Sequence, residues 1–292
     1  MNRYLRHLAA ERRLSPHTVA NYRRDLETLV QFTEGRPLDA LASTDLRRAI
    51  VGLRAQGLAA TSVARHLSSW RGFYTYACRR LGFTANPCVG LRPPKAPKQL
   101  PQPLSPDACA QLLDTRGADP DAPALHARDR AMFELLYSSG LRLAELAGLD
   151  LADVDLASGE AQVTGKGRKT RVVPVGRQAL AALQAWLPLR AALARDTPAL
   201  FVSQRGARLG PRSVQLRLER WAQQAGLTQH VHPHLLRHAF ATHVLQSSGD
   251  LRAVQDMLGH ASISTTQVYT HLDWQHLAKI YDQAHPRARR KS

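Results

Sequence analysis

The chain has 292 residues, of which 44% are hydrophobic, and a formal net charge of +17 from 40 Lys and Arg against 23 Asp and Glu. This length and hydrophobic content suffice for an ordinary buried core and suggest two domains, whereas no apolar run approaches the roughly 20 residues that cross a bilayer. Because the N-terminus, MNRYLRHLAAERRL, also lacks the apolar stretch of a secretion signal, we expect a cytoplasmic protein without membrane insertion.

The positive charge is concentrated at the front of the chain. Residues 1–100 carry 17 basic and 6 acidic side chains, a balance of +11, and residues 101–292 carry 23 and 17, a balance of +6. Such an excess predicts a polyanionic partner. Nucleic acid is favoured over an anionic membrane surface, because no basic amphipathic helix with a strong apolar face stands out.

The first 85 residues are predicted to be entirely helical. Ser15 followed by Pro16 is typical of a helix start, and further helices are expected after residues 43–44 and over about residues 61–80. The arginines of these helices are dense enough to follow the phosphates of a duplex. They are Arg12, Arg13, Arg23, Arg24, Arg47, Arg48, Arg65, Arg71, Arg79 and Arg80. We therefore predict a core-binding, DNA-binding domain over residues 1–85.

Residues 86–104 are predicted to form a linker. The stretch NPCVGLRPPKAPKQLPQP contains six prolines and no acidic residue, a composition that disfavours helix and favours an extended chain. An extended basic linker would let two domains grip opposite faces of a DNA helix. The hypothesis is a two-domain DNA clamp.

The second domain, residues 105–292, is predicted to be mainly α with a small antiparallel β-sheet. The stretch ALHARDRAMFELLYSSG is typical of a helix that ends at Gly140, and EAQVT, the turn GKGRK and TRVVPV are typical of a β-hairpin. The stretch LFVS at 200–203 suggests a further strand, and helices are expected again from Pro211.

Six polar residues of this second domain occur in otherwise apolar or turn-rich settings, and they define the candidate catalytic set. They are Arg142, Lys166, His234, Arg237, His260 and Tyr269. With two arginines, a hairpin lysine, two histidines and a late tyrosine in this order, the sequence resembles the tyrosine recombinase family. The stretch RHAFATHVLQSSGDLRAVQDMLGHASISTTQVYTHL is similar to the XerC branch of that family.

The resemblance implies a role for each residue. Arg142 and Arg237 would pair with the oxygens of the scissile phosphate, since guanidinium groups bind phosphate bidentately. His234 would act as the base and Lys166 as the general acid for the leaving 5′-oxygen. His260 would align the phosphate, and Tyr269 would form the 3′-phosphotyrosine link. This chemistry conserves the energy of the broken bond, so no cofactor is expected.

Local context alone favours simpler interpretations of the same residues. Arg142 follows a predicted helix end, where an arginine commonly pairs with an acid such as Glu145. Lys166 has equally basic neighbours, Arg171 among them, and Tyr269 could pack in the core as one of seven tyrosines. Only the ordered set argues against these alternatives together.

Metal and nucleotide sites are not predicted. His234 and His238 have helical spacing but lack the glutamate of an HExxH motif, and no cysteine lies near them to complete a zinc site. Cys78, Cys88 and Cys109 form neither an even set nor a CxxC pair, so we expect reduced thiols. GKGRKT lacks the ending of a phosphate-binding loop.

The predicted function is that of a site-specific recombinase acting on double-stranded DNA. The resemblance implies a XerD-like recombinase as partner in a heterotetramer, resolution of chromosome dimers at a dif-like site during cell division, and a septal DNA translocase as a further partner. It also suggests that residues after Tyr269 form a C-terminal tail that is passed to a neighbouring protomer, and docking of this tail on its own domain is the alternative. A phage-type integrase, a topoisomerase of the same chemistry and a helical DNA-binding regulator without catalysis are the alternatives.

Overall fold

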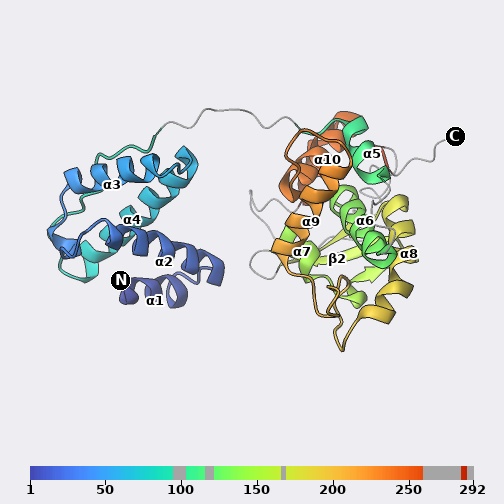
Figure 1. Ribbon diagram of the computed structural model, residues 1–292, viewed down its shortest axis with the longest axis horizontal. Helices are drawn as coiled ribbons and strands as arrows, with labels where there is room; N and C mark the ends of the chain where they lie inside the picture. Colours follow the sequence, from blue (N-terminus) through green and yellow to red (C-terminus); the bar gives the residue numbers. More distant parts are fainter. Residues whose placement is uncertain (95–102, 116–121, 166–168, 259–283, 288–292) are drawn as a thin grey trace. The chain divides into compact units, whose positions relative to one another are not determined.

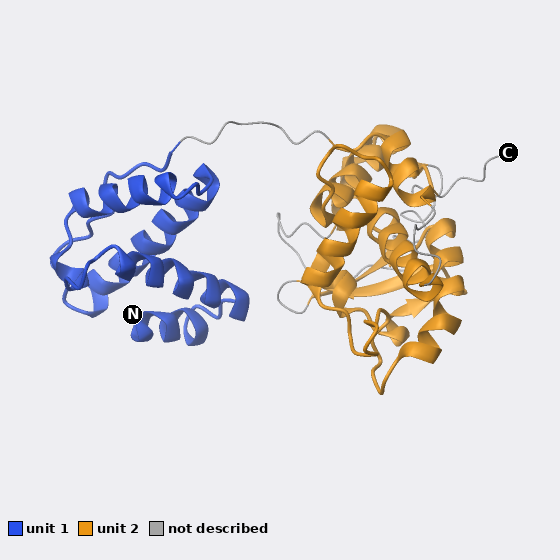
Figure 2. Ribbon diagram, viewed as in Figure 1, with its two compact units in different colours: residues 1–100 blue, residues 101–292 orange. Residues whose placement is uncertain are grey.

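The structure is a computed structural model that describes residues 1–94, 103–115, 122–165, 169–258 and 284–287. The chain divides into two compact units, Met1–Leu100 and Pro101–Ser292 (Figure 2). The described residues are mainly helical, with one three-stranded antiparallel sheet in the second unit, which confirms the predicted fold class. No helix in the described ranges is both long and apolar enough to cross a membrane.

The described part of unit 1 contains helices and no strand (Figure 1). Ser15 caps the second helix as predicted, because its hydroxyl accepts a hydrogen bond from the backbone N–H of Thr18 at 3.2 Å. The helices are α1 (Asn2–Ala10), α2 (Pro16–Gln31), the 3-10 helix η1 (Leu38–Ala40), α3 (Ser43–Ala55) and α4 (Ala60–Arg80).

Trp70 of α4 lies at the centre of the core of unit 1. Its ring is fully buried, and its Nε1 donates a hydrogen bond to the carbonyl oxygen of Asp25 in α2 at 2.7 Å. The carboxylate of Asp25 forms an ion pair with Arg65 of α4. Cys88 and Leu91 are also buried in this core, so the chain packs onto unit 1 beyond the end of α4. The first part of the predicted linker is therefore in contact with the helices.

Unit 2 combines helices with the small sheet (Figure 1). The elements are α5 (Pro106–Asp114), α6 (Pro123–Ser138), α7 (Leu143–Gly148), η2 (Leu151–Asp153), β1 (Val154–Asp155), β2 (Glu160–Thr164), β3 (Thr170–Pro174), α8 (Arg177–Leu193), α9 (Pro211–Gln224), α10 (Pro233–Ser248) and α11 (Leu251–Leu258).

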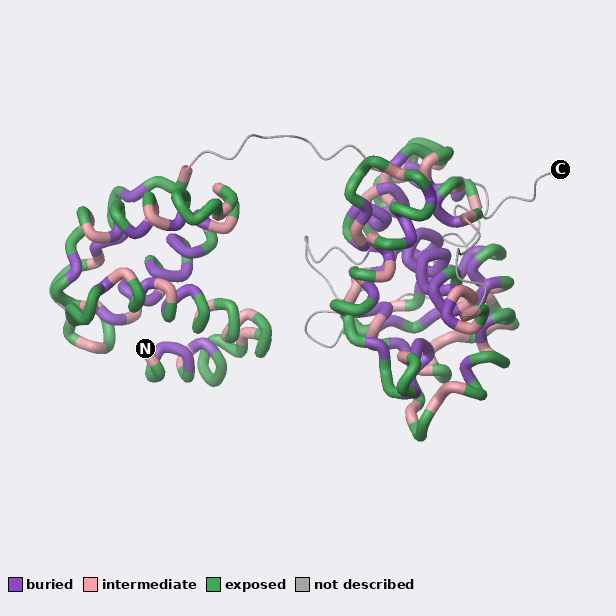
Figure 3. Tube along the Cα trace, in the orientation of Figure 1, coloured by how far each residue is buried: buried purple, intermediate pink, exposed green. Residues whose placement is uncertain are grey.

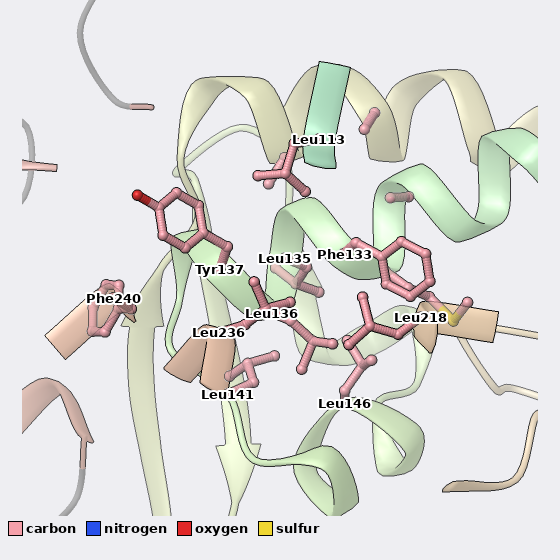
Figure 4. Packing of buried hydrophobic residues seen from close by; sticks show 14 of the residues in the cluster. Leu113, Phe133, Leu135, Leu136, Tyr137, Leu141, Leu146, Leu218, Leu236 and Phe240 are labelled. Carbon is pink, nitrogen blue, oxygen red and sulfur yellow. The ribbon is translucent and has the colours of Figure 1, made fainter. Parts of the chain in front are cut away.

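Helix α6 lies in the interior of unit 2. Its last eight residues are all buried, and it contacts α5, α7, α8, α9 and α10. Figure 4 shows Leu136 of α6 and the following Leu141 beside Leu236 of α10, and all three side chains are fully buried. Figure 3 shows that buried residues gather in the interior of this unit. Burial around α6 therefore fixes the starts of α7 and α10, which carry three of the candidate site residues, Arg142, His234 and Arg237.

The sheet has the strand order β1-β2-β3, and all pairs are antiparallel. In the predicted hairpin, Ala161 pairs with Val173 and Val163 with Arg171. Directly paired residues share a face, and Ala161, Val163 and Val173 are buried, so this face of the hairpin packs on the core.

One sequence prediction in this unit is wrong, and one helix was not predicted. The expected strand at 200–203 does not form, because within this segment only Val202 makes an isolated bridge, with Arg208, although Leu200 and Phe201 are buried. Its apolar side chains fill the core from a loop. Helix α8 was not predicted, because it begins without a side-chain cap and contains Pro188.

Residues 284–287 dock on their own unit. His285 is fully buried, with its ring centroid 4.8 Å from that of Tyr137 and 5.6 Å from that of Phe240. Arg287 forms an ion pair with the buried carboxylate of Glu134 and a second one with Asp114, at 2.8 Å. These four residues are anchored by both packing and charge.

Candidate active site

Arg142 lies at the start of α7, directly after a tight turn from α6. The turn needs Gly140, which has a φ of +58° and lies so close to the ring of Phe240 that a Cβ atom would be 2.4 Å from the ring. The guanidinium of Arg142 donates from Nη1 to Oε1 of Glu145 at 2.7 Å, and its side chain is 42% exposed. The charged end of Arg142 is thus both oriented by the protein and open to solvent.

Glu145 is the carboxylate around which the site is organised. Its side chain is 2% exposed and accepts hydrogen bonds from the backbone N–H and side chain of Arg142 and from both terminal nitrogens of Arg171. Burial by itself would raise the pKa of Glu145, but the hydrogen bonds from Arg171 and Arg142 outweigh it and lower the pKa to about 2. Glu145 is therefore ionised at neutral pH.

Arg237 of α10 is the second predicted arginine, and it is 6% exposed. It donates from Nη1 to the carbonyl oxygen of Gly140 at 2.5 Å and from Nη2 to that of Leu258 at 2.7 Å. Burial, with Arg142 and Arg171 as nearby charges, lowers the pKa of Arg237 to about 10, so it stays protonated at neutral pH. The structure brings Arg142 and Arg237 together at the turn that contains Gly140.

The cluster carries an excess of positive charge. Among the described residues, three guanidinium groups, from Arg142, Arg171 and Arg237, lie around the carboxylate of Glu145, and these four groups sum to a net charge of +2 in a partly buried setting. An anion with several oxygens, such as a phosphodiester, is the ligand that guanidinium groups pair with best.

His234 lies at the exposed start of α10, one turn before Arg237. Residues three apart lie on neighbouring positions of a helix surface, so His234 and Arg237 share a side of α10. The ring of His232 stacks on that of His234, with centroids 6.4 Å apart and planes at 7°, and its Nδ1 accepts the backbone N–H of Leu235 at 3.2 Å. His232 thus both caps the helix and packs against the candidate base.

The other three members of the predicted set, Lys166, His260 and Tyr269, lie outside the described residues. The described residues end next to Lys166 and close to His260 in the sequence. The backbone N–H of Gly165 donates to the carbonyl oxygen of Lys169 at 2.8 Å, which closes the base of the hairpin turn, and α11 ends at Leu258, whose carbonyl Arg237 contacts.

Sequence reasoning named Glu145 only as an ion-pair partner and Arg171 only as a basic neighbour of Lys166. The signal that could have distinguished Arg171 is the alternation of the strand. Arg171 precedes the apolar Val173 by two residues and so shares its face, whereas the neighbouring Lys169 is exposed at the turn.

The histidines around α10 do not gather into a metal site. Within the described ranges, no group of three or more His, Cys, Asp or Glu side chains could hold a metal ion. His243 instead forms a buried hydrogen bond with the hydroxyl of Tyr137, at 2.9 Å from its Nδ1.

Comparison with known proteins shows to which family the chain belongs. The profile of the Phage integrase family matches residues 103–276, and the profile "Phage integrase, N-terminal SAM-like domain" matches residues 1–81. The chain belongs to the phage integrase family.

Relatives of this phage integrase family member include tyrosine recombinase XerC of Alcanivorax borkumensis, which is 50% identical over 293 residues covering 100% of this chain and 95% of the relative. The crystal structure of XerA recombinase is 31% identical with a TM-score of 0.51, covering 98% of this chain and 99% of that one. XerH bound to a palindromic difH substrate is 24% identical with a TM-score of 0.70, covering 93% of this chain and 81% of that one, and supports the fold. The relatives confirm the resemblance to the XerC branch and the predicted enzyme class, a site-specific tyrosine recombinase that cuts and rejoins DNA.

Proposed function

We propose that this tyrosine recombinase acts as XerC-type enzymes do, with a XerD-like partner in a heterotetramer on double-stranded DNA, to convert chromosome dimers to monomers at a dif-like site during cell division. The observation that carries the proposal is the cluster of Arg142, Arg171 and Arg237 around Glu145, in a chain that is 50% identical to a XerC over its whole length. Multimeric plasmids are a second substrate of the same chemistry, and a septal DNA translocase is a candidate activator.

In the proposed reaction, the guanidinium groups of Arg142 and Arg237 bind the non-bridging oxygens of the scissile phosphate, where negative charge increases in the transition state. His234 accepts the proton of the Tyr269 hydroxyl, whose oxygen attacks phosphorus. The bond from phosphorus to the 5′-oxygen breaks, and Lys166 gives that oxygen its proton. His260 aligns the phosphate. Attack by the 5′-hydroxyl of a second strand on the phosphotyrosine reverses the sequence and rejoins the DNA.

We infer the DNA contacts of unit 1 from the charge and exposure of its arginines. Unit 1 carries the larger share of the positive excess, and most of its arginines are exposed on α2, α3 and α4. Five of them also have internal partners. Arg65 forms an ion pair with Asp25, Arg48 lies 3.9 Å from Asp45, Arg24 donates to the side chain of Asn21, and Arg54 and Arg71 donate to the carbonyl oxygens of Leu58 and Leu91. We therefore assign phosphate contacts first to the remaining arginines, such as Arg47 and Arg79.

A nicked duplex tests the chemistry. The duplex carries a dif-type site selected from genomic fragments by binding to this protein, and covalent protein–DNA complexes are counted on a denaturing gel. We expect a complex with the wild-type protein and none with Tyr269→Phe. A complex that persists in Tyr269→Phe would place the nucleophile elsewhere. Binding without any complex, with or without a XerD-like protein, would favour the DNA-binding regulator.

Two further experiments separate the finer parts of the proposal. A substrate with a better leaving group at the 5′-position should restore cleavage by Lys166→Ala, and a failure to restore it would remove the acid role. Exchange between two dif-type sites should require both this protein and its XerD-like partner. Exchange by this protein alone would instead favour an integrase-like enzyme.

A further inference from the structure

Arg171 is a basic residue on the buried face of the hairpin. It lies in β3 opposite Val163, on the same face as Val173, and its side chain is only 9% exposed. A charged side chain in such a position is costly to bury unless its hydrogen bonds are satisfied. The hydrogen bonds of Arg171 offset the cost of burying its charge.

The guanidinium of Arg171 connects three segments of unit 2. Nη1 and Nη2 donate to the two carboxylate oxygens of Glu145 in α7, at 2.7 and 2.8 Å, and Nε donates to the carbonyl oxygen of Met257 in α11, at 3.2 Å. The bidentate pair fixes the plane of the Glu145 carboxylate, and that carboxylate also binds the backbone and side chain of Arg142.

Arg171 and Arg237 together fix the end of α11. Arg171 donates to the carbonyl oxygen of Met257, and Arg237 donates to that of the next residue, Leu258. Both carbonyl groups belong to the last described turn of α11, so the two arginines bind adjacent backbone groups of this helix. The strand, the start of α7 and the end of α11 are thereby held to one another at the arginine cluster.

We propose that Arg171 is a positioning residue of the recombinase, which orients Arg142 through Glu145 and sets the end of α11 beside Arg237. It does not touch the DNA. This inference rests on the proposed function, since it assigns to Arg142 and Arg237 the binding of the scissile phosphate.

Arg171→Lys is the decisive variant. Lysine keeps the positive charge but has a single nitrogen, which cannot make the planar pair with Glu145 and also reach Met257 in the same geometry. The matched control is Arg190→Lys in α8. Arg190 is also largely buried in the same unit but donates to the carbonyl oxygens of Thr197 and Ala199.

The experiment measures three quantities for the full-length wild-type, Arg171→Lys and Arg190→Lys proteins on the selected nicked duplex. They are the DNA affinity, the rate of covalent complex formation by bound protein in a single turnover, and the folded fraction at the assay temperature. We expect Arg171→Lys to bind DNA within twofold of wild type and to form the complex about 10- to 100-fold more slowly per folded molecule, the loss typical of a displaced catalytic group. Arg190→Lys should form the complex within about threefold of the wild-type rate per folded molecule.

Three results would overturn the role of Arg171. They are a wild-type cleavage rate per folded Arg171→Lys molecule, a loss that appears entirely in DNA affinity, and an equal loss of rate in Arg190→Lys. In each of these cases the wild-type protein still forms its covalent complex and the proposed function stands. A wild-type protein that forms no complex on any duplex would instead overturn the proposed function, and the role of Arg171 with it.

Discussion

The anchor of the C-terminal residues 284–287 should weaken in mild acid because it contains a buried imidazole. His285 is fully buried against Tyr137, Phe240 and His243, with Arg287 close by. Burial lowers the pKa of His285 to about 3, against ~6.5 for an exposed imidazole. Because the folded pKa lies below the unfolded one, His285 contributes its full stability above about pH 6.5 and loses it as the pH falls from there toward about 3.

The size of the effect follows from the two pKa values. At about pH 5, roughly 1.5 units below the unfolded pKa, the unfolded chain has bound most of a proton at this site and the folded chain has not. At about 1.36 kcal/mol per unit, this difference lowers the free energy of unfolding by about 2 kcal/mol. We would measure urea denaturation at about pH 7.5 and about pH 5 for the wild-type protein and for His285→Gln, which cannot titrate. The control is His230→Gln, which removes an exposed imidazole in the same unit.

The comparison between variants isolates His285 from all other groups. The wild-type protein should lose about 2 kcal/mol more than His285→Gln between the two pH values, whereas His230→Gln should follow the wild type. Equal pH dependence in wild type and His285→Gln would refute the reasoning, because it would mean that the imidazole is protonated as easily in the folded protein as in the unfolded chain.

Three further predictions concern the packing, charge and helix capping of the site. Gly140→Ala should lower the free energy of unfolding by about 2–5 kcal/mol in the same denaturation assay, because it adds left-handed backbone strain and overlap with the ring of Phe240. The control is Gly249→Ala, at a glycine with φ +69° and no atom within 4 Å of an added Cβ, which should lose only about 1–2 kcal/mol. Glu145→Gln should be less stable than wild type at neutral pH, and the difference in the free energy of unfolding should shrink by about 2 kcal/mol at about pH 3. The folded pKa of Glu145 is about 2, so the stability that its carboxylate contributes is lost as the pH falls toward that value. A difference that stays constant with pH would contradict this. His232→Ala should cost about 1 kcal/mol by removing the cap of α10, whereas His232→Asn, which can accept the same N–H, should cost a few tenths, and equal losses would count against the cap.

The helices of unit 1 and the hairpin of unit 2 could be predicted from the sequence because their signals are local. Ser15 and Pro16 specify a helix start by the chemistry of two residues, and the glycines of GKGRK specify a turn between two alternating stretches. Helix α8 has no comparable signal, since it starts without a side-chain cap and contains Pro188. Its place is decided by burial against α6, which is a contact between distant parts of the chain.

Part of the candidate site could also be predicted from the sequence, and part could not. Arg142 and Arg237 were predicted because a family signature places them, and the structure brings them to one turn at Gly140. The catalytic roles of all six predicted residues stay predictions, and Lys166, His260 and Tyr269 lie outside the described residues. The buried environment of Glu145 could not be predicted, because it depends on a strand, a helix start and a helix end that meet only in the folded chain.

The pairing of Arg142 with Glu145 reconciles two interpretations that the sequence set against each other. A structural ion pair and a phosphate-binding role seemed to be alternatives, yet the side chain of Arg142 is 42% exposed while it donates to Glu145. An arginine has five N–H donors in a rigid plane, so donation to a carboxylate does not exclude donation to a ligand. In the proposed role, the ion pair would reduce the conformational entropy that Arg142 loses on binding a phosphate, and Arg171, by fixing Glu145, would contribute to the same effect.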